Sequence, residues 1–131
     1  MPQYASTPER ERILARYPDY AVEIREAPGH FRVTLDDALI AESDRALEVH
    51  ESFHEVVIYF PLDAVRRGAL EATDHRTYCP FKGDASYYSV QLGDTRVENA
   101  AWSYRTPMDE VTGLAGHLAF YPERLQIHRG D

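Results

Sequence analysis

The sequence predicts a mostly β, antiparallel fold with an N-terminal helix, and three observations lead to this prediction. Short stretches in which apolar and polar residues alternate recur along most of the chain, which is typical of strands with one buried face. Turn-forming residues such as Gly29 and Asp36-Asp37 separate these stretches. No helical pattern falls regularly between them, so the strand–helix–strand rhythm of a parallel sheet is missing.

The first expected element is the helix. Ser6 or Thr7 can cap it, and Pro8 suits a position in its first turn. Pro18 ends it, because the residue before a proline is pushed out of the helical region. Its apolar stripe is narrow, so we expect the helix to pack on the outside of a sheet; the stripe consists of Ile13, Leu14 and Tyr17.

The strands follow. Residues 56–60 are nearly all apolar, which predicts a central strand buried on both faces. A short helix is expected at residues 63–67, closed by Gly68, and one helical turn within the loop 107–116. The other strands are expected at 20–25, 31–35, 39–42, 46–52, 73–79, 86–92, 97–104, 117–121 and 125–128.

Length and composition limit the possible classes of protein. We interpret residues 1–131 as one domain, with 1–18 as a helical extension and 20–128 as the β domain. A formal charge of −8 argues against general nucleic-acid binding, which needs a basic face. The chain shows neither an apolar signal segment nor a membrane span, so we expect a cytoplasmic protein, monomeric or homodimeric, without a membrane partner. One cysteine excludes an intramolecular disulfide.

The only cysteine and the only lysine, Cys79 and Lys82, lie three residues apart between two expected strands. An ammonium group beside a thiol favours the thiolate, so Cys79 is a candidate nucleophile and Lys82 a candidate catalytic residue. Lys82 could instead bind an anionic ligand, which the backbone at Gly83 would allow to approach closely. The structural alternative is a plain hairpin with a buried cysteine and a solvated lysine.

Aromatic residues surround these positions. Trp102 and Tyr104 share one strand face, and with Tyr78 they could form a stacking wall for a flat ligand. The same residues would also suit a core between sheets. His117 at a strand start is a candidate general base, or alternatively a hydrogen-bonded core residue.

An acidic group suggests a different chemistry. Glu42 and Asp44 could hold magnesium for nucleotidyl transfer if both side chains pointed the same way. Arg45, beside them, is a further candidate ligand-binding residue. Asp44 could equally pair with Arg45 or form a turn. We expect neither a bound metal nor another cofactor, and magnesium only if the protein is a nucleotidyltransferase.

Five stretches together resemble the bacterial family called domain of unknown function 427, which has been labelled nucleotidyltransferase-like. The likeness covers roughly residues 20–128, and the stretches are 41–47, 57–61, 77–83, 99–104 and 115–121. The resemblance implies a compact, tent-like β fold in which two antiparallel sheets meet along one edge. Related tent-like folds often hold zinc through paired Cys-x-x-Cys motifs, but this chain has Cys79 alone, so a structural zinc is not expected.

Three hypotheses for the function follow. The first is a pocket that binds a small flat or anionic ligand through Lys82, Trp102, Tyr78 and nearby residues. The second, which rests mainly on the family label, is metal-dependent nucleotidyl transfer. The third is a module that associates with another protein.

Overall fold

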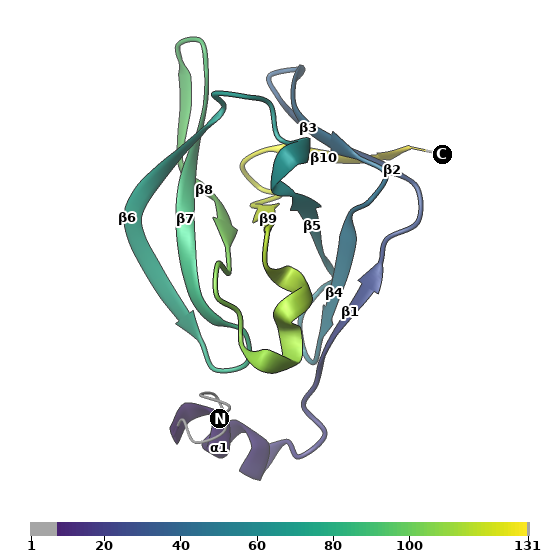
Figure 1. The fold of residues 1–131 in the computed structure, drawn as a ribbon, viewed down its shortest axis with the longest axis vertical. Helices are drawn as coiled ribbons and strands as arrows, with labels where there is room; N and C mark the ends of the chain where they lie inside the picture. Colours follow the sequence, from purple (N-terminus) through teal and green to yellow (C-terminus); the bar gives the residue numbers. More distant parts are fainter. Residues whose placement is uncertain (1–7, 131) are drawn as a thin grey trace.

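The computed structural model describes residues 8–130, which form two antiparallel sheets (Figure 1). The first sheet has seven strands, which lie in the order β1 (Val22–Glu26), β4 (Leu47–Glu51), β5 (Val57–Pro61), β9 (His117–Phe120), β8 (Thr95–Ser103), β7 (Gly83–Leu92) and β6 (Leu70–Cys79). The second has three strands, in the order β10 (Gln126–Gly130), β2 (His30–Leu35) and β3 (Ala38–Ser43). The predicted fold class, mostly β with two antiparallel sheets and few short helices, is confirmed.

The first hydrophobic core lies between the two sheets. Phe31 of β2 meets Phe60 of β5 edge to face, with ring centroids 6.5 Å apart, and Phe60 packs in the same way on Phe120 of β9 at 5.8 Å. Such edge-to-face pairs add to the stabilisation from apolar burial. This core therefore fixes the small sheet against one face of the large sheet.

The opposite face of the large sheet carries a second core. It contains Tyr59 of β5 and Tyr87 of β7, and the 3-10 segment η2 (Asp109–Leu114) covers it with Val111 and Leu114. Tyr59 and Phe60 are both buried, one in each core, so residues 56–60 do form an inner strand with two covered faces. Its beginning differs from the prediction, because Val56 precedes the strand and is 47% exposed.

Two elements depart from the expected pattern for local reasons. The helix expected at 63–67 is only the 3-10 turn η1 (Leu62–Ala64), because Val65 pairs with Ala41 and the Arg66 amide donates to the Ile40 carbonyl at 2.7 Å. In β8, Asn99 has a φ of +49° next to an irregularity in the pairing with β7. This bulge interrupts the simple alternation that we predicted for the strand.

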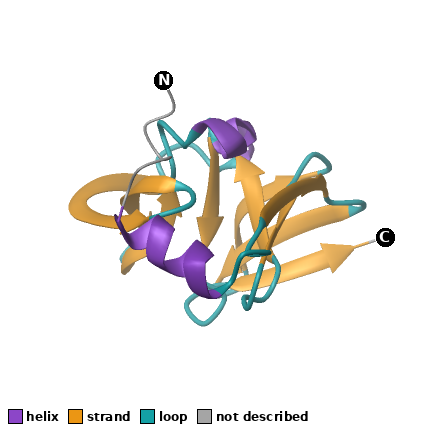
Figure 2. Cartoon of the chain, turned by 90° about the horizontal axis from the view of Figure 1, so that it is seen from below, coloured by secondary structure: helices purple, strands orange, loops and turns teal. Residues whose placement is uncertain are grey.

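The helix α1 (Pro8–Arg16) begins with Pro8, and the caps predicted at Ser6 or Thr7 lie outside the described residues. It does not pack on the outside of a sheet as expected, since none of its residues is buried. Instead it lies across one end of the molecule, beside the β6–β7 hairpin and the start of β1 (Figures 1 and 2). Among residues 8–130 we find no helix with the length and apolar character needed to cross a membrane.

Candidate functional site

The tip of the β6–β7 hairpin positions Lys82. Cys79 and Gly83 are the last pair of the two strands, and the Lys82 amide donates to the Cys79 carbonyl at 3.3 Å. Pro80 occupies the second position of this turn, where its fixed φ is favourable. The Met108 amide donates to the Lys82 carbonyl at 3.1 Å. The tip is therefore held both by its own strands and by the segment before η2.

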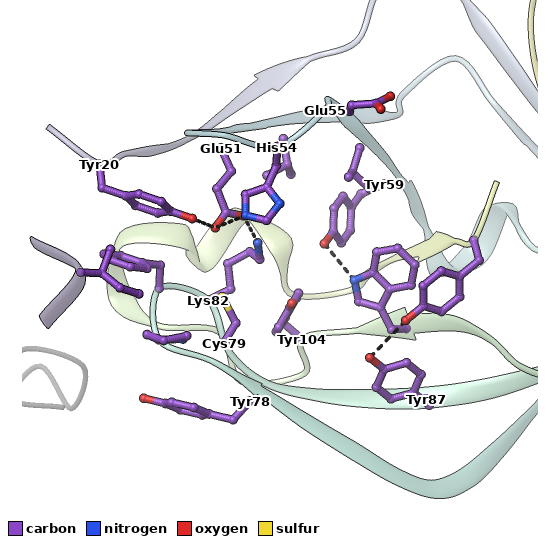
Figure 3. A pocket seen from close by; sticks show the side chains of 17 residues that line it. Tyr20, Glu51, His54, Glu55, Tyr59, Tyr78, Cys79, Lys82, Tyr87 and Tyr104 are labelled. Carbon is purple, nitrogen blue, oxygen red and sulfur yellow. Dashed lines mark hydrogen bonds and ion pairs between the residues drawn. The ribbon is translucent and has the colours of Figure 1, made fainter. Parts of the chain in front are cut away.

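A cavity of about 590 Å³ lies beside this tip, on the side of the second core (Figure 3). Ile13 of α1 lines one part of it, and His54 and Glu55 of the β4–β5 loop line another. Most of the remaining wall is aromatic and comes from Tyr20, Tyr59, Tyr78, Phe81, Tyr87, Trp102, Tyr104 and Tyr121. The cavity is therefore built from segments far apart in the sequence.

Lys82 forms an ion pair with Glu51, the last residue of β4, and both side chains are largely buried. Glu51 also accepts a hydrogen bond from the hydroxyl of Tyr20. Burial first, and this bond second, raise the pKa of Tyr20 above its usual value, so Tyr20 remains a donor. The imidazole Nε2 of His54 lies 3.8 Å from the same carboxylate. The positive charge of Lys82 is therefore already matched inside the protein.

Two hydrogen-bonded groups fix the aromatic wall. Trp102 donates its indole N–H to the Tyr59 hydroxyl at 3.1 Å. Tyr121 donates to Tyr87 at 3.3 Å, and Tyr87 in turn shares a hydrogen bond of 3.0 Å with Thr77. Burial first, then the bond to Tyr87, raises the pKa of Tyr121 to about 12. The Tyr121 hydroxyl therefore stays protonated at neutral pH, and the hydrogen bonds hold the rings in place.

Tyr104 is different. It is only 6% exposed and lines the cavity, yet its hydroxyl has no hydrogen-bond partner within the described chain. Lys82 Nζ lies 5.9 Å from the centre of its ring. Burial raises the pKa of Tyr104 far above its usual value, so the group is a neutral phenol.

The structure brings together five of the residues predicted from the sequence. Cys79, Lys82, Tyr78, Trp102 and Tyr104 all line the cavity (Figure 3). Their predicted roles in binding or catalysis stay predictions.

Three other predicted residues lie elsewhere. Gly83 packs towards Thr106 and Met108 rather than facing the cavity. His117 starts β9 outside the cavity lining, and its Nδ1 lies 3.1 Å from the Ala115 carbonyl. Arg45 is exposed on the surface, 3.8 Å from Asp63.

Glu42 and Asp44 also lie outside the cavity, on and just after β3. They do point the same way, but towards His30: Nε2 lies 2.9 Å from Glu42 and Nδ1 lies 2.5 Å from Asp44. The bond to Asp44 first, then the bond to Glu42, raises the pKa of His30. Within residues 8–130 no group of three or more His, Cys, Asp or Glu residues is arranged to hold a metal ion.

Sequence reasoning did not assign Glu51 and Tyr59 to the site. Glu51 lies 31 residues from Lys82, and no local pattern connects the two. Tyr59 is buried in the second core and also lines the cavity. One feature of the sequence could have drawn attention to Glu51: it is an acidic residue near the end of a predicted strand, and an aromatic residue follows in the next turn.

Comparison with protein-family models finds a match over most of the chain. The family model described as "Domain of unknown function (DUF427)" matches residues 23–130, which is most of the chain and includes the whole cavity wall except the part from α1 and Tyr20. None of the curated proteins matches the chain.

Proposed function

Because the chain belongs to the DUF427 family, whose description assigns no activity, we propose from its own geometry that it binds a small, planar organic molecule in the cavity. The observation that carries this proposal is the aromatic wall around a space of about 590 Å³. Ligand cavities commonly have volumes of roughly 300–1,000 Å³ and largely apolar linings with a few polar groups.

The arrangement of the rings favours a flat ligand. Trp102 contacts Tyr121 with ring centroids 4.5 Å apart, and Tyr59 meets Trp102 nearly at a right angle. Ring faces and edges presented in this way attract another planar π system in stacked or edge-to-face geometry. The hydrogen bonds that hold the rings are made before any ligand arrives, so little conformational entropy is lost on binding.

The charges favour a neutral ligand over an anionic one. Lys82 was the reason to expect an anion, but Glu51 already neutralises it. Glu55 adds a further negative charge to the lining. A bound anion would have to lose its water and lie near two carboxylates, which is unfavourable in a partly buried site.

A titration of ¹⁵N-labelled protein with planar bicyclic compounds tests this proposal. The chain has one tryptophan, so the indole N–H of Trp102 gives a single resonance that reports on the cavity. Binding is expected to shift this resonance and to raise the melting temperature, since a ligand of the native state stabilises it.

Matched variants locate the binding. Tyr78 is 43% exposed and lines the cavity, whereas Leu39 is 36% exposed and lies on the other sheet. We expect Tyr78→Ala to weaken binding about three- to tenfold, because one aromatic contact is lost, and Leu39→Ala to leave binding unchanged. Equal effects of both variants, or no shift with any planar compound, would contradict the proposal.

The same screen separates the alternatives. A stabilisation by nucleoside triphosphates that requires magnesium would favour nucleotidyl transfer. In the structure the two carboxylates considered for magnesium, Glu42 and Asp44, are paired with His30 instead. Stabilisation by no small molecule, together with self-association or a stable protein partner, would favour an association module.

A further inference from the structure

The buried hydroxyl of Tyr104 calls for a partner. Tyr104 lies in the cavity wall and is 6% exposed. Its hydroxyl neither donates a hydrogen bond to residues 8–130 nor accepts one from them. Native proteins rarely leave a buried polar group unpaired, because the group has given up its bonds to water. A hydroxyl in this situation inside a cavity is therefore a position at which a ligand atom can complete the bonding.

Three buried or half-buried side chains of the cavity wall, Tyr59, Lys82 and Tyr104, still have hydrogens to donate, whereas the Glu55 carboxylate in the lining is exposed. The Tyr59 oxygen accepts from Trp102, but its own hydrogen has no acceptor in the described part of the chain. Lys82 carries three hydrogens, and its one hydrogen-bond acceptor there is Glu51. Tyr59, Lys82 and Tyr104 all line this cavity; in Figure 3 the Lys82 ammonium is directed towards Glu51, and Tyr104 lies below Lys82 and Tyr59 in this view.

The buried carboxylate of the cavity, that of Glu51, already accepts two hydrogen bonds. One oxygen of Glu51 accepts from Lys82, and the other accepts from Tyr20. Each oxygen can accept a further bond, so a ligand that offered only N–H or ammonium donors would have to share these oxygens with Lys82 and Tyr20. A ligand that offers an acceptor oxygen meets the free donors of Tyr59, Lys82 and Tyr104 directly.

The geometry points to a neutral, planar carbonyl compound as the ligand class, with the carbonyl oxygen accepting a hydrogen bond from Tyr104 and a second from Lys82 or Tyr59. This assignment rests on the proposed function, and it adds the chemical group that the cavity recognises. The planar part stacks on the aromatic wall, and the carbonyl oxygen accepts from the Tyr104 hydroxyl, which makes no hydrogen bond within the described protein.

Four probes on one scaffold test the assignment: 1-indanone, indane, 1-aminoindane and indane-1-carboxylate. They share a bicyclic ring and differ in offering a neutral acceptor, no polar group, a cation or an anion. Dissociation constants come from titrations of the full chain followed at the Trp102 indole resonance. We expect 1-indanone to bind about fivefold or more tightly than each of the others, as expected for one or two net hydrogen bonds.

The variant Tyr104→Phe removes the hydroxyl and keeps the ring. It should weaken binding of 1-indanone about fivefold and leave binding of indane unchanged. A second measurement needs no variant: the ¹³C resonance of a labelled 1-indanone carbonyl should stay at its aqueous position or move downfield on binding, because its hydrogen bonds are replaced. An upfield shift would mean that the oxygen has lost its donors.

The outcomes are distinct. If indane, the amine or the carboxylate binds as tightly as 1-indanone, if Tyr104→Phe affects indane and 1-indanone equally, or if the carbonyl moves upfield, the carbonyl assignment is wrong while the planar-ligand proposal stands. If none of the four probes and no other planar compound shifts the indole resonance, both are overturned.

Discussion

Glu51 at the end of β4 and Lys82 at the tip of the β6–β7 hairpin form an ion pair whose side chains are 8% and 12% exposed. Separate strands are needed to bring the two charges together. Removing one partner of a buried pair leaves the other charge without compensation, which costs more than the pair itself contributes.

We therefore expect Glu51→Gln to lower the free energy of unfolding by about 3 kcal/mol. Glu55→Gln, in the adjoining loop, is the matched control: Glu55 is exposed and makes no ion pair with any described residue, so its change should stay within about 0.5 kcal/mol. Urea denaturation measures both. The double variant Glu51→Gln/Lys82→Met should lose less than the sum of the single losses. Strict additivity would show that the two side chains do not interact in solution.

Tyr59 and Tyr104 are both buried in the second core, but only the Tyr59 hydroxyl has a hydrogen bond in the described chain. Tyr59→Phe removes the acceptor of the Trp102 indole and should destabilise the protein by about 1 kcal/mol. Tyr104→Phe removes an unpaired buried hydroxyl and should stabilise the ligand-free protein by about 1 kcal/mol. Thermal unfolding of the two variants should therefore move in opposite directions. Loss of stability in Tyr104→Phe would mean that its hydroxyl is bonded, for example to water.

Much of the strand pattern could be predicted from the sequence, because several strands are short alternating or apolar stretches between turn-forming residues. Residues 31–35 alternate between apolar and polar side chains, and residues 117–121 form a short apolar run; the observed strands, His30–Leu35 and His117–Phe120, differ from prediction by one residue at an end. The bulge at Asn99 could not be predicted, since it depends on the pairing of β8 with β7. Asparagine adopts a positive φ more often than most residues, but this preference is too weak to predict the conformation of a single residue.

Part of the candidate site could also be predicted from local sequence patterns. Pro80 and Gly83 mark a turn locally, so Lys82 could be placed at a hairpin tip. Glu51 could not be assigned as its partner, because strand order decides which side chains meet across 31 residues. Arg45 was a candidate because of its neighbours in sequence, and the structure places it outside the cavity, on the surface near Asp63; its role in binding stays a prediction.

His30 gives a pH dependence of known sign. Its hydrogen bonds to Asp44 and then Glu42 raise its pKa above the ordinary value of 6.5. A raised pKa in the folded state means that protonated His30 stabilises the fold. This contribution is fully present below about pH 6.5 and is lost as the pH rises through the folded-state pKa. The melting temperatures of wild type and His30→Gln should therefore differ most near pH 5.5 and converge at alkaline pH.

Titration of the His30 ring by NMR checks the cause. In Glu42→Gln/Asp44→Asn the pKa of His30 should fall back towards 6.5, because both acceptors lose their charge. A difference in melting temperature that grows with pH would contradict the assigned sign.

Cys79 is the only cysteine, so its accessibility can be measured without interference. Its half-buried thiol lies on the cavity wall, which a small reagent can enter more easily than a large one. For each reagent we compare the rate of reaction with Cys79 in the folded and in the unfolded protein. We expect folding to slow the reaction with iodoacetamide less than the reaction with a bulky maleimide. Protein in urea provides the reference rates. A bound planar compound should slow the reaction of Cys79 with both reagents. If the rates are the same with and without the compound, the thiol lies outside the space that the compound occupies.

Gly83 ends the turn that presents Lys82, and its φ of +112° lies in a region that residues with a side chain rarely adopt. An added Cβ would meet the Thr106 carbonyl oxygen at 3.5 Å, an ordinary contact, so the cost of Gly83→Ala comes from the backbone rather than from crowding. We expect a loss of about 1–3 kcal/mol. Gly113→Ala is the matched control, because Gly113 has no positive φ and its added Cβ would also have a nearest neighbour at 3.5 Å, Ile24 Cδ1. Urea denaturation should show Gly83→Ala as clearly less stable than Gly113→Ala. Equal stabilities would mean that the turn relaxes to another geometry, in which case the Lys82–Glu51 pair should also be weakened.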